Sequence, residues 1–151
     1  MADSGLGLSK AAASARYIRA LAVLSLDPKG IDAKHRDVLL QWIDDTFLEN
    51  EIFYAKARGA VLMRTGSPQA AVGFVSNTNQ LLFKHIGALA FLQLGETEAA
   101  ERLLEETGAR FRDHRRQDPQ RTFPASFDWK IWLINRLLHH EAASKLAASP
   151  E

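Results

Sequence analysis

Proline and glycine residues divide this chain into segments rich in alanine and leucine, and none of these segments shows the apolar–polar alternation of a β-strand. Alanine and leucine are strong helix formers, whereas β-branched residues, which favour strands, are sparse. A proline also keeps the residue before it out of helical geometry, so the breakers mark helix ends. We therefore predict an all-α fold of about six to seven helices with no sheet.

The expected helices follow these breakers. The first covers 10–26, and the second starts after Asp32, whose carboxylate can cap it. The apolar pattern over 33–65 is long for one helix of a compact domain, so we expect a break near 49–51. Ser67 can cap a helix that has Pro68 at its first position and pauses near 76–79. Further helices are expected at 80–94, 97–111 and 127–148, with a loop over 112–125.

Composition indicates the class of protein. The chain has 151 residues, of which 46% are hydrophobic and 25% charged, which is typical of one globular domain. We expect a disordered N-terminus over 1–8 and a single all-α domain over 9–151. The formal net charge of +1 argues against wholesale binding of nucleic acid or a membrane surface. The absence of cysteine excludes a disulfide scaffold and thiolate zinc sites, and with no readable signal peptide or membrane span we expect a cytoplasmic protein.

Two stretches of the sequence repeat each other at an offset of 29 residues. Residues 59–71 read GAVLMRTGSPQAA and residues 88–100 read ALAFLQLGETEAA. In both, an Ala-Ala pair begins four residues after a glycine, and a third, looser copy is IWLINRLLHHEAA at 131–143. Glycine can end a helix in the left-handed conformation, and small alanines let a second helix approach closely. The pattern predicts helical hairpins at 52–76, 81–111 and 127–148.

These units resemble the tetratricopeptide repeat family, whose pattern has a small residue, an aromatic residue three later, an alanine nine beyond it and a large apolar residue four further. The matching positions are Gly59, Leu62, Ala71 and Val75, then Ala88, Phe91, Ala100 and Leu104, then Ile131, Ile134, Ala143 and Ala147. The resemblance implies a concave groove, lined by the first helix of each hairpin, that holds a peptide or a partner helix. Its groove positions correspond to Lys56, Met63, Arg64, His85, Leu89, Gln93, Trp132, Asn135 and Arg136.

The sequence offers little support for catalysis or a metal. His139 and His140 are adjacent, so on a helix they point about 100° apart, whereas metal ligands are spaced three or four residues apart. We interpret them as a partly exposed helix end and expect no metal and no cofactor. No motif places an acid, a base or a nucleophile, so we do not expect an enzyme.

The segment 110–121, RFRDHRRQDPQR, carries the densest positive charge. Arginine suits phosphates and carboxylates, so this loop is an alternative contact for nucleic acid or an acidic partner. Its cations are Arg110, Arg112, Arg115, Arg116 and Arg121. Nearby, Trp129 and Trp132 are expected to be mostly core, with room for one of them to face a groove.

The leading function is therefore a protein–protein interaction module, adaptor or chaperone-like, that binds another protein or a peptide, for which an acidic apolar segment would suit the groove. The first alternative is a regulatory or helper subunit that contacts nucleic acid or an acidic partner through the arginine-rich loop. The second is a small-ligand-binding helical bundle or an enzyme of unspecified class. Homo-oligomerisation stays open.

Overall fold

The computed structural model describes residues 17–26, 31–47, 51–73, 79–122, 124 and 129–150. These residues form helices and contain no strand, which confirms the predicted all-α fold without a sheet. The expected N-terminal segment 1–8 and the start of the first expected helix lie outside the described residues. A helical segment at 17–26 is followed by η1 (Ala33–His35), α2 (Arg36–Phe47), α3 (Glu51–Arg64), α4 (Pro68–Val72), α5 (Leu81–Gln93), α6 (Thr97–Gln117) and α7 (Trp129–Ala148).

None of the helices in the described part of the chain combines the length and the apolar character that a membrane crossing requires.

Gly66 and Gly95 end α3 and α5 in the same way. Both have positive φ angles, 77° and 76°, which side chains resist. The N–H of the residue after each glycine donates to the carbonyl five residues earlier, at 2.8 Å for Ser67 and 2.9 Å for Glu96. This bond is the hallmark of the Schellman helix end. The two glycine turns predicted from the sequence repeat are thus confirmed.

The helix starts follow the sequence less uniformly. The Asp32 carboxylate accepts the backbone N–H of Lys34 at 3.0 Å, in the short 3-10 turn that leads into α2. The predicted serine cap at Ser67 is wrong, because its hydroxyl makes no capping bond. It accepts a hydrogen bond from Arg36 at 2.9 Å instead. Pro68 does occupy the start of α4.

The chain over 33–65 forms two helices that pack on each other, α2 and α3, as expected, and the break placed near 49–51 lies largely outside the described residues. The helix after Pro68 is shorter than expected: α4 ends at Val72 and is followed by Gly73. The pause predicted at 76–79 falls largely outside the described residues.

Two expectations for the C-terminal third are wrong. Residues 112–117 are not a loop, because α6 continues to Gln117 and ends just before the Asp118-Pro119 breaker. The third hairpin at 127–148 does not exist, because α7 is one helix from Trp129 to Ala148. The cause is the absence of any glycine or proline in that range, so the alanine pair at 142–143 simply extends the helix.

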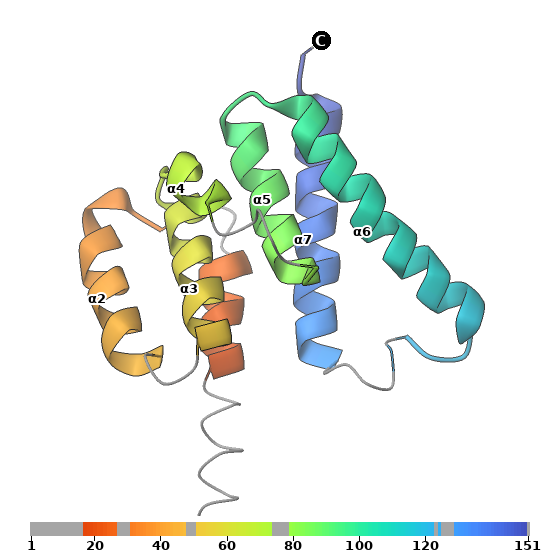
Figure 1. The fold of residues 1–151 in the computed structure, drawn as a ribbon, viewed down its shortest axis with the longest axis horizontal. Helices are drawn as coiled ribbons and strands as arrows, with labels where there is room; N and C mark the ends of the chain where they lie inside the picture. The colour runs from red at the N-terminus through yellow and green to blue at the C-terminus, as the bar shows by residue number, and fades with distance from the viewer. Residues whose placement is uncertain are drawn as a thin grey trace, which may run out of the picture.

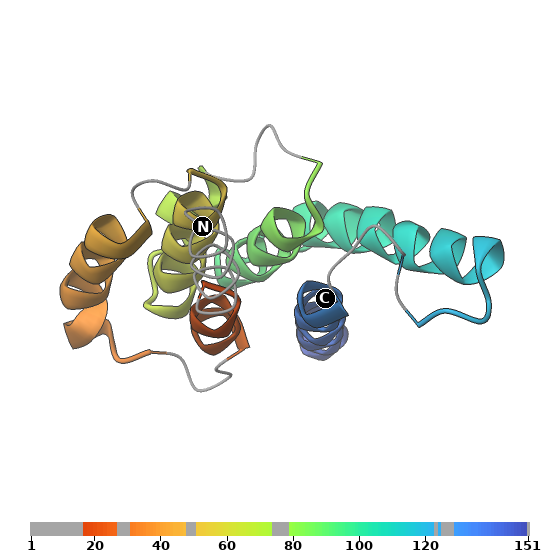
Figure 2. The ribbon, with the colours of Figure 1, turned by 90° about the horizontal axis from the view of Figure 1, so that it is seen from below.

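The helices form two layers. Figure 1 shows α3, α5 and α6 side by side, with α2 flanking α3 and α4 crossing near the end of α3. Figure 2, turned by 90°, shows the helical segment 17–26 and α7 on the same side of the row formed by α3, α5 and α6. α5 is the central element: it contacts α3, α4, α6 and α7, and ten of its thirteen residues are buried.

The main core lies between these two layers. It joins Leu21 and Leu24 of the first segment to Met63 on α3, Leu89 on α5 and Leu138 on α7. The repeated alanines fulfil their expected packing role, since Ala71 and Ala100 are fully buried between helices.

Candidate functional site

The nine residues predicted to line a peptide groove lie mostly in the interior. Gln93 and Arg136 are exposed, while the other seven are buried: Lys56, Met63, Arg64, His85, Leu89, Trp132 and Asn135. They come from α3, α5 and α7, so the structure does bring the three predicted sets together. The side chains that they meet, however, belong to this chain. α7 and the segment 17–26 pack against α3 and α5, so the seven buried residues are internal contacts and the site assignment is corrected accordingly.

Arg64 shows how the interior is closed. Its guanidinium binds both carboxylate oxygens of Glu141 on α7, with Nη1–Oε1 at 2.7 Å and Nη2–Oε2 at 2.6 Å. Its Nε also donates to the carbonyl of Ser25 at 3.0 Å. Burial raises the pKa of Glu141, but the bonds from Arg64 and Lys145 outweigh burial and hold that pKa below its usual value. Arg64 therefore bridges α3, α7 and the end of the segment 17–26.

A chain of polar side chains joins α5, α6 and α7 just beside this core. His85 Nδ1 donates to the Asn135 side-chain oxygen at 2.8 Å, because the Asn135 amide nitrogen donates to the carbonyl of Ile131. His85 Nε2 then accepts from His139 Nδ1 at 3.3 Å, and that Nδ1 also lies 3.1 Å from the Thr107 hydroxyl. These contacts are satisfied with both rings neutral when His85 and His139 each carry their proton on Nδ1.

The physical setting favours the neutral form. Burial lowers the pKa of His85 to about 4. Burial, followed by the nearby charges of Arg136 and Arg112, lowers the pKa of His139 as well. His139 is thus part of an internal contact in the middle of α7, and its interpretation as a helix end is wrong.

An open hollow of about 600 Å³ lies between the second half of α6, residues 118–122 and the first half of α7. Its size is within the range of ligand pockets, roughly 300–1,000 Å³. The lining residues are Phe111, His114, Arg115, Pro119, Arg121, Thr122, Trp129, Trp132, Leu133 and Arg136. None of these lining residues, all in the described part of the chain, is acidic.

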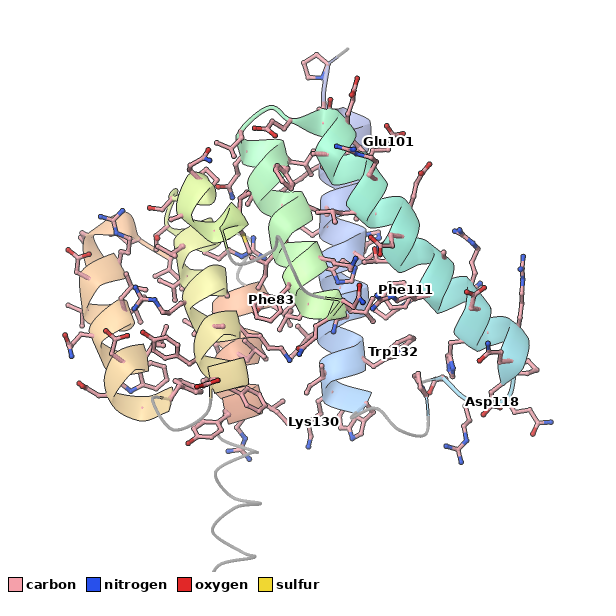
Figure 3. All side chains as sticks on the ribbon, in the orientation of Figure 1. Phe83, Glu101, Phe111, Asp118, Lys130 and Trp132 are labelled. Atoms are coloured by element: carbon pink, nitrogen blue, oxygen red, sulfur yellow. The ribbon has the colours of Figure 1, made fainter. Side chains whose placement is uncertain are left out.

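The back wall of the hollow is aromatic. Phe111 from α6 meets Trp132 from α7 edge-to-face, with ring centroids 4.9 Å apart, and Figure 3 shows Trp132 extending from α7 towards α6. The ring of His114 packs on Trp132 at 5.3 Å. Phe111 also stacks on the buried His85, at 5.9 Å, so the wall rests directly on the internal polar chain.

Three arginines stand around this wall. Arg136 lies over the ring of Phe111 at 4.9 Å, and Arg121 pairs with Asp118 at 3.3 Å. Arg115 and Arg136 form no ion pair with any acidic residue in the ranges that the structure describes. Among the described residues, these two cations therefore lie beside apolar surface without a carboxylate partner.

The five arginines of the alternative loop do not act as one cluster. Most of them are on α6, and only Arg115 and Arg121 line the hollow. Arg110 donates to the carbonyl of Asn79, and Arg112 lies over Gly108 near His139. The alternative site is therefore corrected to two of its five residues, joined by Arg136 from α7.

An apolar stripe continues from the hollow along α7. Trp129, Leu133 and Leu137 are 52%, 48% and 47% exposed and follow one another at intervals of four residues. Trp132, by contrast, is 8% exposed, so one tryptophan is core and the other faces solvent, as the sequence allowed. We call the combined region the α6–α7 surface, defined by Trp129, Leu133, Leu137, Arg115, Arg121 and Arg136.

Sequence reasoning missed three contributors: Phe111 as an aromatic wall, and Leu133 and Leu137 as exposed leucines. The signal for the leucines was present, because α7 is apolar on nearly every side and a helix packed on only part of its circumference must expose some of them. Within the described ranges, no group of three or more His, Cys, Asp or Glu residues is placed to hold a metal ion.

Comparison with known proteins identifies no relative: no family model matches the chain, and neither does any curated protein or solved structure.

Proposed function

We propose that this protein is a protein–protein interaction module, adaptor or chaperone-like, whose α6–α7 surface binds an acidic segment of a partner protein that also carries apolar side chains. The cytoplasmic location expected from the sequence is part of the proposal. The binding site differs from the groove first expected, because seven of the nine residues assigned to that groove are buried within this chain.

The observation that carries the proposal is the proximity of half-exposed apolar side chains to two arginines, Arg115 and Arg136, that pair with no carboxylate in the described part of the chain. Complete burial of an exposed leucine is worth about 1.5–3 kcal/mol, so a partner that covers the half-exposed Leu133 or Leu137 gains about half of that at each. Tryptophan and arginine are also the residues most enriched among those that dominate binding energy at interfaces. Arg115 and Arg136 can each hold a carboxylate by two parallel bonds. The surface thus offers apolar contact and charge recognition within one region.

The other two functions fit this surface less well. A nucleic acid is held chiefly through its phosphates, and an exposed leucine stripe contributes little to such contacts. A small ligand would fill the hollow, but it would leave Leu137 exposed, since that residue lies beyond the lining. A protein segment can contact both the hollow and the exposed Leu137 beyond it.

Selection from a peptide library displayed on phage, with the full chain as bait, tests the proposal. We expect enrichment of sequences with net negative charge and at least one leucine or aromatic residue. Binding of the enriched peptides should fall more than about tenfold in the Arg115→Glu/Arg136→Glu double variant, because repulsion replaces pairing.

The matched control is Arg102→Glu/Arg116→Glu, which changes the net charge equally at two exposed residues of α6 that do not line the hollow. These substitutions should leave the affinity nearly unchanged. Enrichment without acidic bias, or equal losses in the two double variants, would contradict the proposal.

A further inference from the structure

We infer that the partner segment binds as an amphipathic α-helix laid along α7, which specifies the proposed function and rests on it. The inference starts from the apolar stripe on the exposed face of α7, which lies between cationic side chains.

The geometry of the stripe matches the way helices pack. Residues four apart form a ridge on a helix surface, and such a ridge fits into the groove between the rows of side chains of another helix. Trp129, Leu133 and Leu137 form a ridge of this kind. It extends about 12 Å along the helix axis, which is slightly more than two turns.

The backbone chemistry of the surface favours the same form of partner. The stripe lies on a continuous helix, whose interior N–H and C=O groups bond to each other, so it offers no sheet edge to an extended peptide. An extended segment pressed against Leu133 and Leu137 would bury backbone groups without partners, which costs free energy. A partner helix satisfies its own backbone and presents only side chains.

The positive charge around the stripe indicates which residues should flank the apolar side chains of the partner helix. α7 contains a single acidic residue, Glu141, which is already paired with Arg64 and Lys145. Its exposed cations include Lys130 and Arg136, and Arg115 of α6 faces the same hollow as Arg136. We therefore expect apolar residues at intervals of three or four in the partner helix, with Asp or Glu on either side of them.

A second copy of this chain is a poorer occupant. A symmetric antiparallel pairing of two α7 helices about Leu133 would place Trp129 against Leu137 of the other copy. It would also place Lys130 against Arg136 of the other copy, so like charges would meet on both sides of the stripe. An acidic helix from a different protein meets the same cations with opposite charge.

The test compares two synthetic peptides of identical composition, built from leucine, glutamate and alanine. In the first, every fourth residue is leucine, so that the leucines share one helix face. In the second, the same number of leucines is placed in one half of the peptide, where they alternate with other residues as on a strand. With the full chain, we expect the first peptide to bind at least about tenfold more tightly and to gain helical circular dichroism on binding.

Leu137→Glu is the decisive variant, because Leu137 belongs to the stripe and not to the hollow. It should weaken binding of the first peptide about tenfold or more. Val38→Glu, at an exposed apolar residue of α2, is the matched control and should have no effect. Thermal melting checks that both variants fold, and Leu137→Ser is a second variant that adds no charge.

Other outcomes would overturn the inference in distinguishable ways. Equal binding of the two peptides, unaffected by both Leu137 variants, would show an extended segment held in the hollow and would leave the proposed function standing. Failure of both peptides, and of every acidic phage peptide, would remove the proposed function as well. A dimer in sedimentation experiments that Leu137→Glu dissociates would assign the surface to a second copy. Binding only to phosphatidylserine vesicles would assign it to a membrane.

Discussion

Arg64 on α3 and Glu141 on α7 form a two-bonded ion pair across 77 residues of sequence, with the Arg64 side chain only 3% exposed. The carboxylate that the sequence-based hypothesis assigned to a bound peptide at Arg64 is thus supplied by the chain itself. Because removal of one partner leaves the other as an uncompensated buried charge, Glu141→Gln should lower the free energy of unfolding by about 3 kcal/mol.

The control for this prediction is Glu101→Gln, which removes an exposed carboxylate on α6. Chemical denaturation of both variants checks the difference. Equal stabilities would mean that the ion pair does not hold α7 on α3.

Acid should destabilise the protein through His85. Its folded pKa of about 4 lies below the 6.5 of a free histidine, so between these pH values the unfolded chain binds a proton that the folded chain does not. The stabilisation by neutral His85 is therefore complete above pH 6.5 and is lost as the pH falls towards 4, by about 3 kcal/mol in total. His139, with a lowered pKa, acts in the same direction.

Melting temperatures measured from pH 7 to pH 4 check this expectation. His85→Gln keeps a donor for Asn135 but cannot be protonated, so its melting temperature should fall less steeply with acid than that of the wild type. His140→Gln, at an exposed histidine of the same helix as His139, should keep the wild-type slope. Parallel curves for the wild type and His85→Gln would contradict the role of His85.

The register of α7 can be tested at two neighbouring leucines. Leu138 is fully buried, whereas Leu137 is about half exposed. Leu138→Ala should lower the free energy of unfolding by about 2–5 kcal/mol, because it removes buried apolar contacts and leaves a cavity. Leu137→Ala should cost no more than about 1 kcal/mol. The reverse order, measured by denaturant titration, would show that α7 is rotated.

The continuity of α7 separates the observed helix from the predicted hairpin. A hairpin over 127–148 would have its turn near His140, where proline is tolerated. In one helix, a proline at that position removes a backbone bond and clashes with the preceding turn, so His140→Pro should cost about 3 kcal/mol or more. Lys130→Pro, in the first turn of α7, should be far milder. A melting temperature unchanged by His140→Pro would favour the hairpin.

The sequence was most informative where a single residue determines the local backbone. Gly66 and Gly95 correctly predicted the ends of two helices. The length of the apolar pattern over 33–65 correctly predicted two helices there instead of one. The third repeat unit lacked such a glycine, and its alanine pair alone carried no turn. Local signals of this kind act within a few residues, so they predict where helices begin and end better than they predict how the helices pack together.

The site depended on long-range packing, which periodicity does not encode. Most residues that the sequence assigned to a peptide groove are in fact buried where α3 and α5 pack against α7 and the segment 17–26. A helix face that can bind a partner can equally well pack against another part of the same chain. Only the packed structure distinguishes the two, as it does for Arg64, which is internal, and Arg136, which is exposed. The arginine-rich segment was recognised, but its assignment as a loop hid that only Arg115 and Arg121 face the hollow.

The most direct measurement of the central claim uses the tryptophans as reporters, since Trp129 lies in the α6–α7 surface and Trp42 lies on α2. In an amide and indole NMR spectrum of the ¹⁵N-labelled chain, the indole N–H signals come from Trp42, Trp129 and Trp132. Trp42, on α2, is 41% exposed and lies outside the α6–α7 surface, so it is the internal control for Trp129. Titration with the acidic leucine peptide should shift or broaden the Trp129 signal and leave the Trp42 signal in place. A shift at Trp42, or an unchanged Trp129 signal when the peptide is bound, would contradict binding at the α6–α7 surface.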